Sequence, residues 1–273
     1  SVVLTPNPGF PGVAGIPKQN KTVILEWVAD PSVAYQLFAS GQGDIVTLLP
    51  PNYYQQINNT LVPAQQAQIN GPFPSITEYF NVYNNNISVA NLGKIGSGYS
   101  IPHDYFANLW VRQAFAYAFD YATFLNRVLG NQIYGFDFGS SYCGVIVKGL
   151  PYYVPPSQLT GCPSYDLVKA KALLQQSGEF GTAVTFPFVI PSGDTTDYGM
   201  GGIWAAALKS IDPNINMQPV YQNFATIIGY QVNGSDPMPI FNLGWIADYP
   251  YPSDYVDAMY KQGGTYPQSL GWY

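Results

Sequence analysis

The sequence predicts an α/β protein, because segments with the pattern of strands alternate along the chain with segments with the pattern of helices. The strand segments are short and rich in β-branched and aromatic residues, whereas the helical segments carry apolar residues every three or four positions. The chain has 273 residues, 47% of them hydrophobic, which is enough for a sizeable core in one large domain or two lobes.

The first 75 residues are predicted to form a strand–helix–strand–helix unit. Residues 1–20 are rich in Pro and Gly and are expected to be irregular. Asp30 is a good N-cap, Pro31 suits the first helical position, and Gly41 suits the end of the helix that they begin. The predicted strands span residues 22–28 and 44–49, and a second short helix begins at Pro50-Pro51 and runs through Ile57.

A second part of the chain follows the break Gly71-Pro72-Phe73-Pro74, so we place a boundary near residue 75. The longest helix is predicted over residues 104–129, with apolar residues, Leu109 and Trp110 among them, around most of its circumference. Asp166 and Gly178 delimit another helix. Further strands are predicted at 76–83, 183–190, 215–221 and 239–245, further helices at 195–210 and 223–231, and loops at 84–100 and 131–164.

The composition restricts the function. Charged residues make up 10% of the chain, well below the roughly 25% of ordinary soluble domains. The 10 basic and 16 acidic residues give a formal net charge of −6, which argues against nucleic acid as a partner. A surface built on Asn, Gln, Ser, Thr and 23 Tyr would suit an acidic or extracellular setting.

Two cysteines, Cys143 and Cys162, flank a loop rich in Gly and Pro. A disulfide across this loop is expected outside the cell, and the alternative is two unpaired buried thiols. Sequons for N-glycosylation begin at Asn20, Asn58, Asn86 and Asn233, which fits an exported protein. No run of 18 apolar residues and no signal peptide are present, and the abrupt start at SVVLTPNPGF is typical of a processed or truncated chain.

No set of catalytic residues is recognisable. The single histidine, His103, precedes the long helix, and no nucleotide-binding loop, GxSxG elbow or metal-ligand cluster occurs. Asp248 together with Asp254, Asp257 or Glu78 could form the carboxylate pair of a glycoside hydrolase, which is one alternative. A non-catalytic cell-surface interaction module is another. We expect a binding protein without catalytic residues, metal or cofactor.

The segment 241–255, FNLGWIADYPYPSDY, is the candidate ligand-facing loop. An apolar strand ends at Gly244-Trp245, and Asp248, Tyr249 and Tyr251 follow among prolines. A rigid polar and aromatic loop at the end of a strand lies where α/β proteins bind their ligands. The alternative is an ordinary aromatic loop after a core strand.

Four stretches carry a family resemblance. TPNPGFPG with the strand–helix segment that ends in DIVTLLPP is the first, and ITEYFNVYNN is the second. The third is LWVRQAFAYAFDYATFLNRVLG, which contains VRQA-x-AYA-x-D, and the fourth joins YDLVKAKALLQQSG to the GW-x-x-DYP-x-P loop LGWIADYPYPSDY. In this order they resemble the extracellular solute-binding proteins of ABC importers, in the peptide/nickel/oligosaccharide-binding family (family 5).

The resemblance implies a periplasmic-binding-protein-like clamshell of two lobes, of type II and similar to cluster C. Residues 1–75 would belong to the first, terminal lobe and residues 76–273 to the second. Because chains of the family are usually longer on both sides, we interpret this chain as a fragment that lacks part of the first lobe. Such a protein is expected to be a monomer, extracellular or periplasmic, anchored to the membrane at full length, and to deliver its ligand to the ABC permease.

The resemblance also implies a ligand. In peptide-binding members the acid of the GW-x-x-D loop pairs with the amino terminus of the peptide, and Asp248 stands at that position, with Trp245 and Tyr249 shielding the pair. Some of these members have an arginine shortly before the loop, and this chain has none there. Oligosaccharide is therefore the alternative ligand, stacked on the rings of Trp245, Tyr249, Tyr251 and Trp110.

Overall fold

The chain divides into two compact units, Ser1–Asn70 and Gly71–Tyr273, and each is described by itself. The computed structural model describes residues 1–10, 12, 21–28, 30–47, 49–69, 77–231 and 236–270. The predicted break at residues 71–74, the boundary near residue 75 and the sequons at Asn20 and Asn233 lie outside the described residues. Asn58 and Asn86, of the other two sequons, are exposed.

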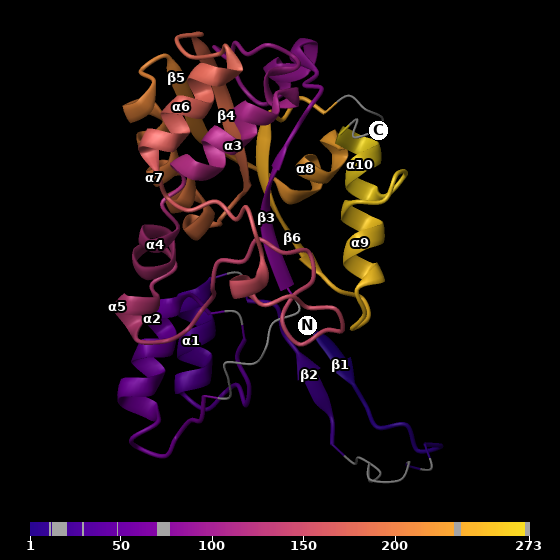
Figure 1. Cartoon of the computed structure of the whole chain (residues 1–273). Coiled ribbons are helices and arrows are strands. Elements are labelled where there is room, and N and C mark those ends of the chain that lie inside the picture. Colours follow the sequence, from indigo (N-terminus) through magenta and orange to yellow (C-terminus); the bar gives the residue numbers. More distant parts are fainter. Residues whose placement is uncertain are drawn as a thin grey trace. The chain divides into compact units, whose positions relative to one another are not determined.

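The first unit consists of a two-stranded ribbon and two helices. The ribbon pairs β1 (Val2–Leu4) with β2 (Val23–Leu25) in antiparallel orientation, so the expectation of an irregular start is wrong for these three residues. The helices are α1 (Pro31–Ala39) and α2 (Pro51–Gln56), followed by a π-helical turn (Ile57–Leu61). Figure 1 shows α1 and α2 side by side, and the rings of Tyr35 and Tyr53 lie 5.2 Å apart.

Helix α1 begins as the sequence predicts. Asp30 Oδ1 accepts hydrogen bonds from the hydroxyl and backbone N–H of Ser32 and from the N–H of Val33, and these bonds lower the pKa of Asp30. The predicted strand at 44–49 is wrong, because its described residues form no strand. Ile45 is 84% exposed, so it is not buried as a core strand residue would be, and Pro50 and Pro51, which follow the segment, supply no N–H groups to a ladder.

The second unit is built on a four-stranded mixed sheet in the order β3-β6-β4-β5. The strands are β3 (Thr77–Tyr83), β4 (Val184–Pro191), β5 (Ile215–Gln222) and β6 (Ile240–Ile246), each close to its predicted range. β4 is parallel to β5 and to β6, whereas β3 is antiparallel to β6. After Phe241, the residues of β6 pair with β3 alone, so these two strands continue as a ribbon past β4 (Figure 1).

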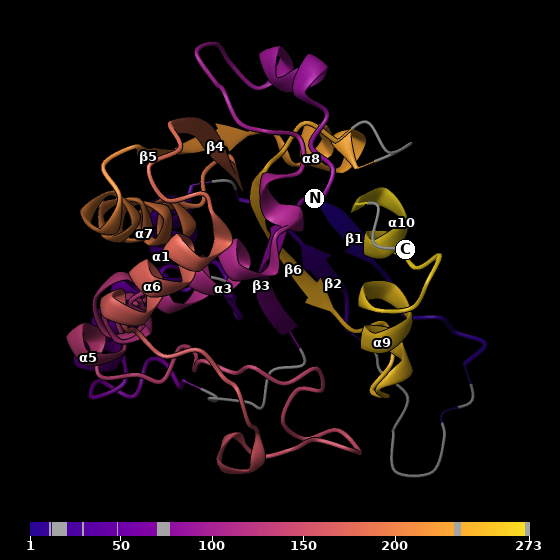
Figure 2. The ribbon, with the colours of Figure 1, turned by 45° about the horizontal axis from the view of Figure 1, so that its top comes forward.

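Helices cover both faces of this sheet (Figure 2). On one face lie α3 (Leu109–Ala118), α6 (Leu167–Ser177) and α7 (Thr195–Ile211), and on the other α8 (Phe224–Tyr230), α9 (Ser253–Met259) and α10 (Thr265–Leu270). Strand residues alternate between the two cores: Phe188 and Ile190 of β4 face α3 and α7, and Val189 faces α8 and α9.

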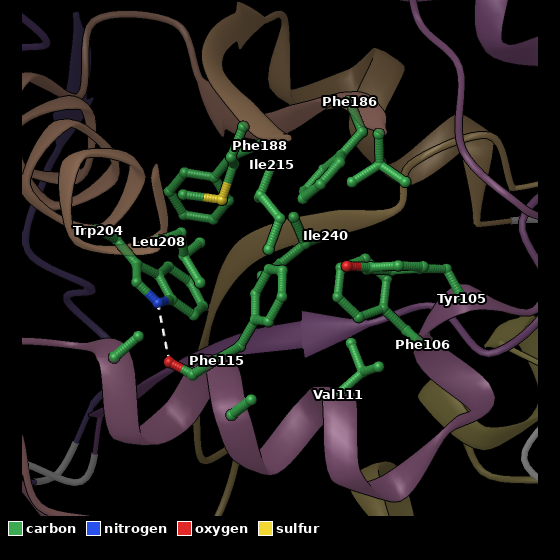
Figure 3. Packing of buried hydrophobic residues seen from close by; sticks show 14 of the residues in the cluster. Tyr105, Phe106, Val111, Phe115, Phe186, Phe188, Trp204, Leu208, Ile215 and Ile240 are labelled. Carbon is green, nitrogen blue, oxygen red and sulfur yellow. Dashed lines mark hydrogen bonds between the residues drawn. The ribbon is translucent and has the colours of Figure 1, made fainter. Parts of the chain in front are cut away.

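The core under α3 and α7 is mainly aromatic. Figure 3 shows Phe115, Phe186, Phe188 and Trp204 converging from α3, β4 and α7, and the ring pairs among them are mostly edge-to-face. The indole Nε1 of Trp204 donates a hydrogen bond of 2.9 Å to the carbonyl oxygen of Phe115. This buried polar atom is therefore satisfied, and it fixes α7 against α3.

The predicted helix at 104–129 is not continuous. A 3₁₀ turn (Tyr105–Ala107) precedes α3, which ends at Ala118. Phe119 is extended, and Asp120 then caps the single turn α4 (Tyr121–Thr123) by accepting from the N–H of Thr123, before a π-helical turn (Phe124–Val128). The N-cap preference of Asp120 outweighs the helical pattern around it, which is the physical reason for the break.

The segment 131–164 is mainly irregular, with α5 (Asn131–Tyr134) and a 3₁₀ turn (Pro156–Gln158). Cys143 and Cys162 form a disulfide, with their Cα atoms 5.7 Å apart. Between them, Ile146, Val147 and Leu150 are buried in the core under α8 and α9, which holds the loop on the sheet. Among the helices of the described residues, none is long and apolar enough to cross a membrane.

Candidate ligand-binding site

The predicted ligand-facing loop follows the carboxyl end of β6. Residues 247–252 connect Ile246, which pairs with the first residue of β3, to α9. The predicted range 241–255 therefore contains the end of a strand, a short loop and the first turn of a helix. Pro250 and Pro252 precede α9 at positions where a helix needs no N–H donor, and Tyr255 is fully buried beneath it.

Asp254 holds this loop in place. Its Oδ2 accepts hydrogen bonds from Nε1 of Trp245 at 2.9 Å and from the backbone N–H of Asp248 at 3.0 Å. The side chain is 8% exposed and lies in the first turn of α9, where an acid is stabilised by the positive end of the helix. From the sequence, Asp254 is a candidate only for a carboxylate pair with Asp248. Its place just after Pro252, at the start of a helix, is the signal in the sequence for this structural role.

Trp245 forms the wall of the loop on the side of α10. Its ring meets the ring of Tyr266 edge-to-face at 6.1 Å, and Tyr266 in turn meets Phe80 of β3 at 5.5 Å. Burial raises the pKa of Tyr266 to about 12, so this phenol stays neutral. Two contacts therefore fix the indole of Trp245: the hydrogen bond from its Nε1 to Asp254 and the edge-to-face packing with the ring of Tyr266.

The carboxylate of Asp248 is exposed, and it accepts no hydrogen bond and pairs with no cation within the part of the chain that the structure describes. Tyr249 and Tyr251, which follow it, are 46% and 49% exposed. The hydroxyl of Tyr249 lies 2.9 Å from Oγ of Ser253. The loop therefore presents a free anionic group together with two aromatic side chains on a backbone that Asp254 fixes.

Trp110, which the sequence groups with this loop, lies away from it in the structure. It is in the first turn of α3 and is 38% exposed, although the sequence suggested a largely buried helix. Arg112 of the same helix donates to Oδ1 of Asn85, just after the last residue of β3. The loop is at the other end of β3, and seven strand residues span about 20 Å, so the structure does not bring Trp110 to Trp245 and Asp248.

The other candidate acids and the histidine are engaged in surface or structural contacts. Asp257 is exposed and lies 3.8 Å from Nζ of Lys261, one helical turn away. Nδ1 of His103 lies 3.7 Å from the exposed carboxylate of Asp104. The side chain of Glu78 lies outside the described residues. Within the described ranges, no three His, Cys, Asp or Glu side chains gather to hold a metal ion.

Comparison with protein-family models shows the family of this chain. The family model described as bacterial extracellular solute-binding proteins, family 5, middle part, matches residues 1–267. A search of curated proteins finds no match. Solved structures, however, share the fold.

One solved structure is the ABC transporter substrate-binding protein CtaP from Listeria monocytogenes, with a TM-score of 0.69 and 15% identity. The superposition covers 94% of this chain and 46% of the CtaP chain. The substrate-binding domain of an oligopeptide ABC transporter from Bacillus anthracis has a TM-score of 0.63 and 18% identity, over 89% of this chain and 42% of the chain from Bacillus anthracis. DppA from Helicobacter pylori, in complex with the peptide STSA, has a TM-score of 0.59 and 18% identity, over 93% of this chain and 42% of the DppA chain. The chain thus spans less than half the length of each of these structures.

Proposed function

Because the chain belongs to the bacterial extracellular solute-binding proteins of family 5, we propose that its protein captures oligopeptides outside the cell and delivers them to the permease of an ABC importer. Proteins of this family act outside the cytoplasm, in the extracellular space or the periplasm. The α/β, periplasmic-binding-protein-like fold that the sequence predicts is confirmed by the solved structures. The proposal adds a ligand class, a membrane anchor at full length, a monomeric state and a permease partner.

The observation that carries the proposal is the free carboxylate of Asp248 on a fixed loop. A peptide ligand has an ammonium group at its amino terminus, and a charge-assisted hydrogen bond to a carboxylate contributes about 1.5–3 kcal/mol. Because Asp254 holds the backbone N–H of Asp248 and the indole of Trp245, little ordering entropy is lost when the ligand binds. DppA from Helicobacter pylori and a further similar structure, OppA from Listeria monocytogenes, were solved with peptides bound, which favours this ligand class.

In the proposed mechanism, residues 1–75 contribute to one lobe and residues 76–273 form most of the other. A ligand that contacts both lobes selects the closed state, because only that state offers both sets of contacts. The closed form would then dock on the permease. Because the chain spans less than half of its solved neighbours, the binding experiments below use the full-length protein.

The test is a calorimetric titration of the full-length protein with an alanine pentapeptide, with its amino terminus either free or acetylated. We expect acetylation, or the substitution Asp248→Asn, to weaken binding by about 10- to 150-fold, which is the 1.5–3 kcal/mol of the lost charge-assisted bond. Asp257→Asn is the matched control, since that exposed acid lies 3.8 Å from Nζ of Lys261 in a surface ion pair, and it should bind like the wild type.

Equal affinity of the wild type and Asp248→Asn for the free peptide would contradict the role of Asp248 as amine anchor. Binding of maltopentaose in the absence of peptide binding would favour the oligosaccharide ligand. The exposed rings of Tyr249 and Tyr251 would then be the groups to substitute.

A further inference from the structure

Two of the four sequons for N-glycosylation lie among the described residues, and neither has a part in the proposed function. One is residues 86–88 (Asn-Ile-Ser), just after β3, and the other is residues 58–60 (Asn-Asn-Thr), in the π-helical turn after α2. A sequon consists of an asparagine and a hydroxyl residue two positions later, so a glycosyltransferase must reach both groups. The backbone between them therefore decides whether a sequon can be used in the folded protein.

In residues 86–88 both groups face outward. Ile87 is 2% exposed and packs in the core under α3 and α7, whereas Asn86 before it is exposed and Ser88 after it is half-buried. No helix or strand includes these residues, and one inward side chain between two outward ones places the outer two on the same side. Oγ of Ser88 accepts a hydrogen bond from Asn91, and the carboxamide of Asn86 makes none within the described part of the chain.

The backbone of this segment is held without the use of the Asn86 carboxamide. The three N–H groups of residues 86–88 donate, in order, to Oδ1 of Asn84 at 2.9 Å, to the carbonyl oxygen of His103 at 2.7 Å and to the carbonyl oxygen of Asp236 at 2.9 Å. A substituent on the Asn86 carboxamide breaks none of these bonds. The fold thus presents this side chain and tolerates its modification.

The sequon at residues 58–60 lacks this arrangement, although Asn58 is also exposed. Its backbone is helical, and side chains two positions apart on a helix do not face each other. The hydroxyl of Thr60 donates a hydrogen bond of 2.6 Å to the carbonyl oxygen of Gln56, and Nδ2 of Asn58 lies 3.4 Å from Oδ1 of Asn59. The carboxamide and the hydroxyl of this sequon are therefore separated and already engaged.

The setting of residues 86–88 is compatible with a glycan. Proteins of family 5 act outside the cytoplasm, and the disulfide between Cys143 and Cys162 is typical of that compartment. The segment follows one end of β3, and the candidate loop 247–252 lies at the other end. Seven strand residues span about 20 Å, so a glycan attached after β3 leaves the loop accessible.

We propose that Asn86 is an N-glycosylation site and that Asn58 is not. The co-substrate is an oligosaccharide joined to a lipid through phosphate. Nδ2 of Asn86 forms a bond to the anomeric carbon of the first sugar, and the bond from that carbon to the phosphate oxygen breaks. The lipid phosphate leaves with the electron pair, one amide proton is released, and no atom is oxidised or reduced.

The test is mass spectrometry of the full-length protein isolated from the cells that produce it. Chymotrypsin, which cleaves after aromatic residues and leucine, places the two sequons in separate peptides, residues 84–92 and residues 55–61. We expect most copies of the first peptide to carry sugar on Asn86, located by electron-transfer fragmentation, and the second peptide to be unmodified.

Variants expressed in the same cells complete the test. Asn86→Gln and Ser88→Ala should each remove the sugar, and Ser88→Thr, which keeps the hydroxyl, should retain it. Asn58→Gln is the matched control and should leave the occupancy of Asn86 unchanged. An unmodified Asn86 in the wild type would overturn the inference, and so would equal occupancy of Asn58, because transfer would then not depend on the folded backbone. Both results leave the proposed function standing, since no ligand contact is involved.

Discussion

Two buried aspartates at the ends of α7 differ in what surrounds the carboxyl group. Asp212 accepts hydrogen bonds from three N–H groups, two of them on Asn214, whereas the carboxyl of Asp197 has no partner among the described residues. Both residues look alike in the sequence, because each is an acid next to an apolar helical segment. The difference depends on which chain segments pack against each end of the helix, and this is a tertiary property.

The unpartnered carboxyl of Asp197 predicts that stability falls as the pH rises. Its pKa is about 7 in the folded protein and 3.8 when unperturbed, so between these values the folded state holds a proton that the unfolded state has lost. This contribution is complete below pH 4 and is lost as the pH rises to 7. The groups that face Asp197 are Asp194 and Tyr79, and neither supplies positive charge.

The measurement is urea unfolding of the wild type and Asp197→Asn at pH 5 and pH 8. The wild type should lose stability between the two, and Asp197→Asn should lose less. The remaining loss is assigned to Asp236, whose pKa is also raised to about 7 by burial. Asp212→Asn is the matched control: it should destabilise by about 1–3 kcal/mol at both pH values, because it disturbs hydrogen bonds that are already made. An unchanged pH dependence in Asp197→Asn would contradict the prediction.

Local signals made some residues predictable. Asp30 and Asp166 cap helices in the structure as the sequence suggests, because an N-cap bonds only to backbone groups two or three residues ahead. The roles of Asp254 and Asp197 could not be derived in this way. Asp254 acts on Trp245, nine residues earlier on a neighbouring strand, and Asp197 gains its surroundings from β3.

Among the secondary-structure elements, the four strands of the sheet in the second unit were predicted because β-branched, aromatic and other apolar residues are frequent in each of them. The segment 44–49 has the same apolar character but forms no strand over its described residues, since strand formation requires a partner that no local pattern reveals. The long helix was predicted too long for a similar reason: Asp120 satisfies the backbone of a new turn, and the apolar pattern continues across the break.

The element that positions the candidate site is the first turn of α9, and Asp254→Ala tests it. The substitution removes the acceptor for the indole N–H of Trp245 and for the N–H of Asp248. We expect a loss of stability of about 1–3 kcal/mol and, because the loop is then no longer fixed, peptide binding about tenfold weaker. Hydrogen exchange of the Trp245 indole N–H, followed by NMR, should become faster.

Asp254→Asn is the control for this experiment. Its amide oxygen can still accept both hydrogen bonds, so slow indole exchange and peptide affinity should be largely retained. If Asp254→Ala exchanged as slowly as the wild type, packing against Tyr266 alone would hold Trp245, and Asp254 would have no positioning role.

For the whole molecule, the order of four motifs was sufficient to predict the family, and the match over residues 1–267 confirms it. Such motifs encode an α/β unit with a loop at the edge of its sheet, which the structure contains. They do not encode which side chains meet across elements, and for that reason Trp110 was grouped with a loop that lies at the other end of β3. Sequence patterns report the order of elements more faithfully than the contacts between them.

The disulfide acts on the whole chain, because it constrains the unfolded state. Cys143 and Cys162 are 19 residues apart, and a closed loop of this length stabilises a protein by roughly 3 kcal/mol on the loop-entropy model. We therefore expect the double substitution Cys143→Ser/Cys162→Ser to lower the free energy of unfolding in urea by about that amount. The folded loop should keep its place, since Ile146, Val147 and Leu150 remain buried in the core.

Reduction of the wild type with dithiothreitol should shift its unfolding midpoint to that of the double variant, whereas the variant itself should not respond to the reductant. The native far-UV circular dichroism of both forms should coincide, because the loop is held on the sheet by burial of its apolar side chains as well as by the covalent bond. A loss of native circular dichroism in the double variant before any urea is added would contradict this account. The disulfide would then be required for the core under α8 and α9 to form at all.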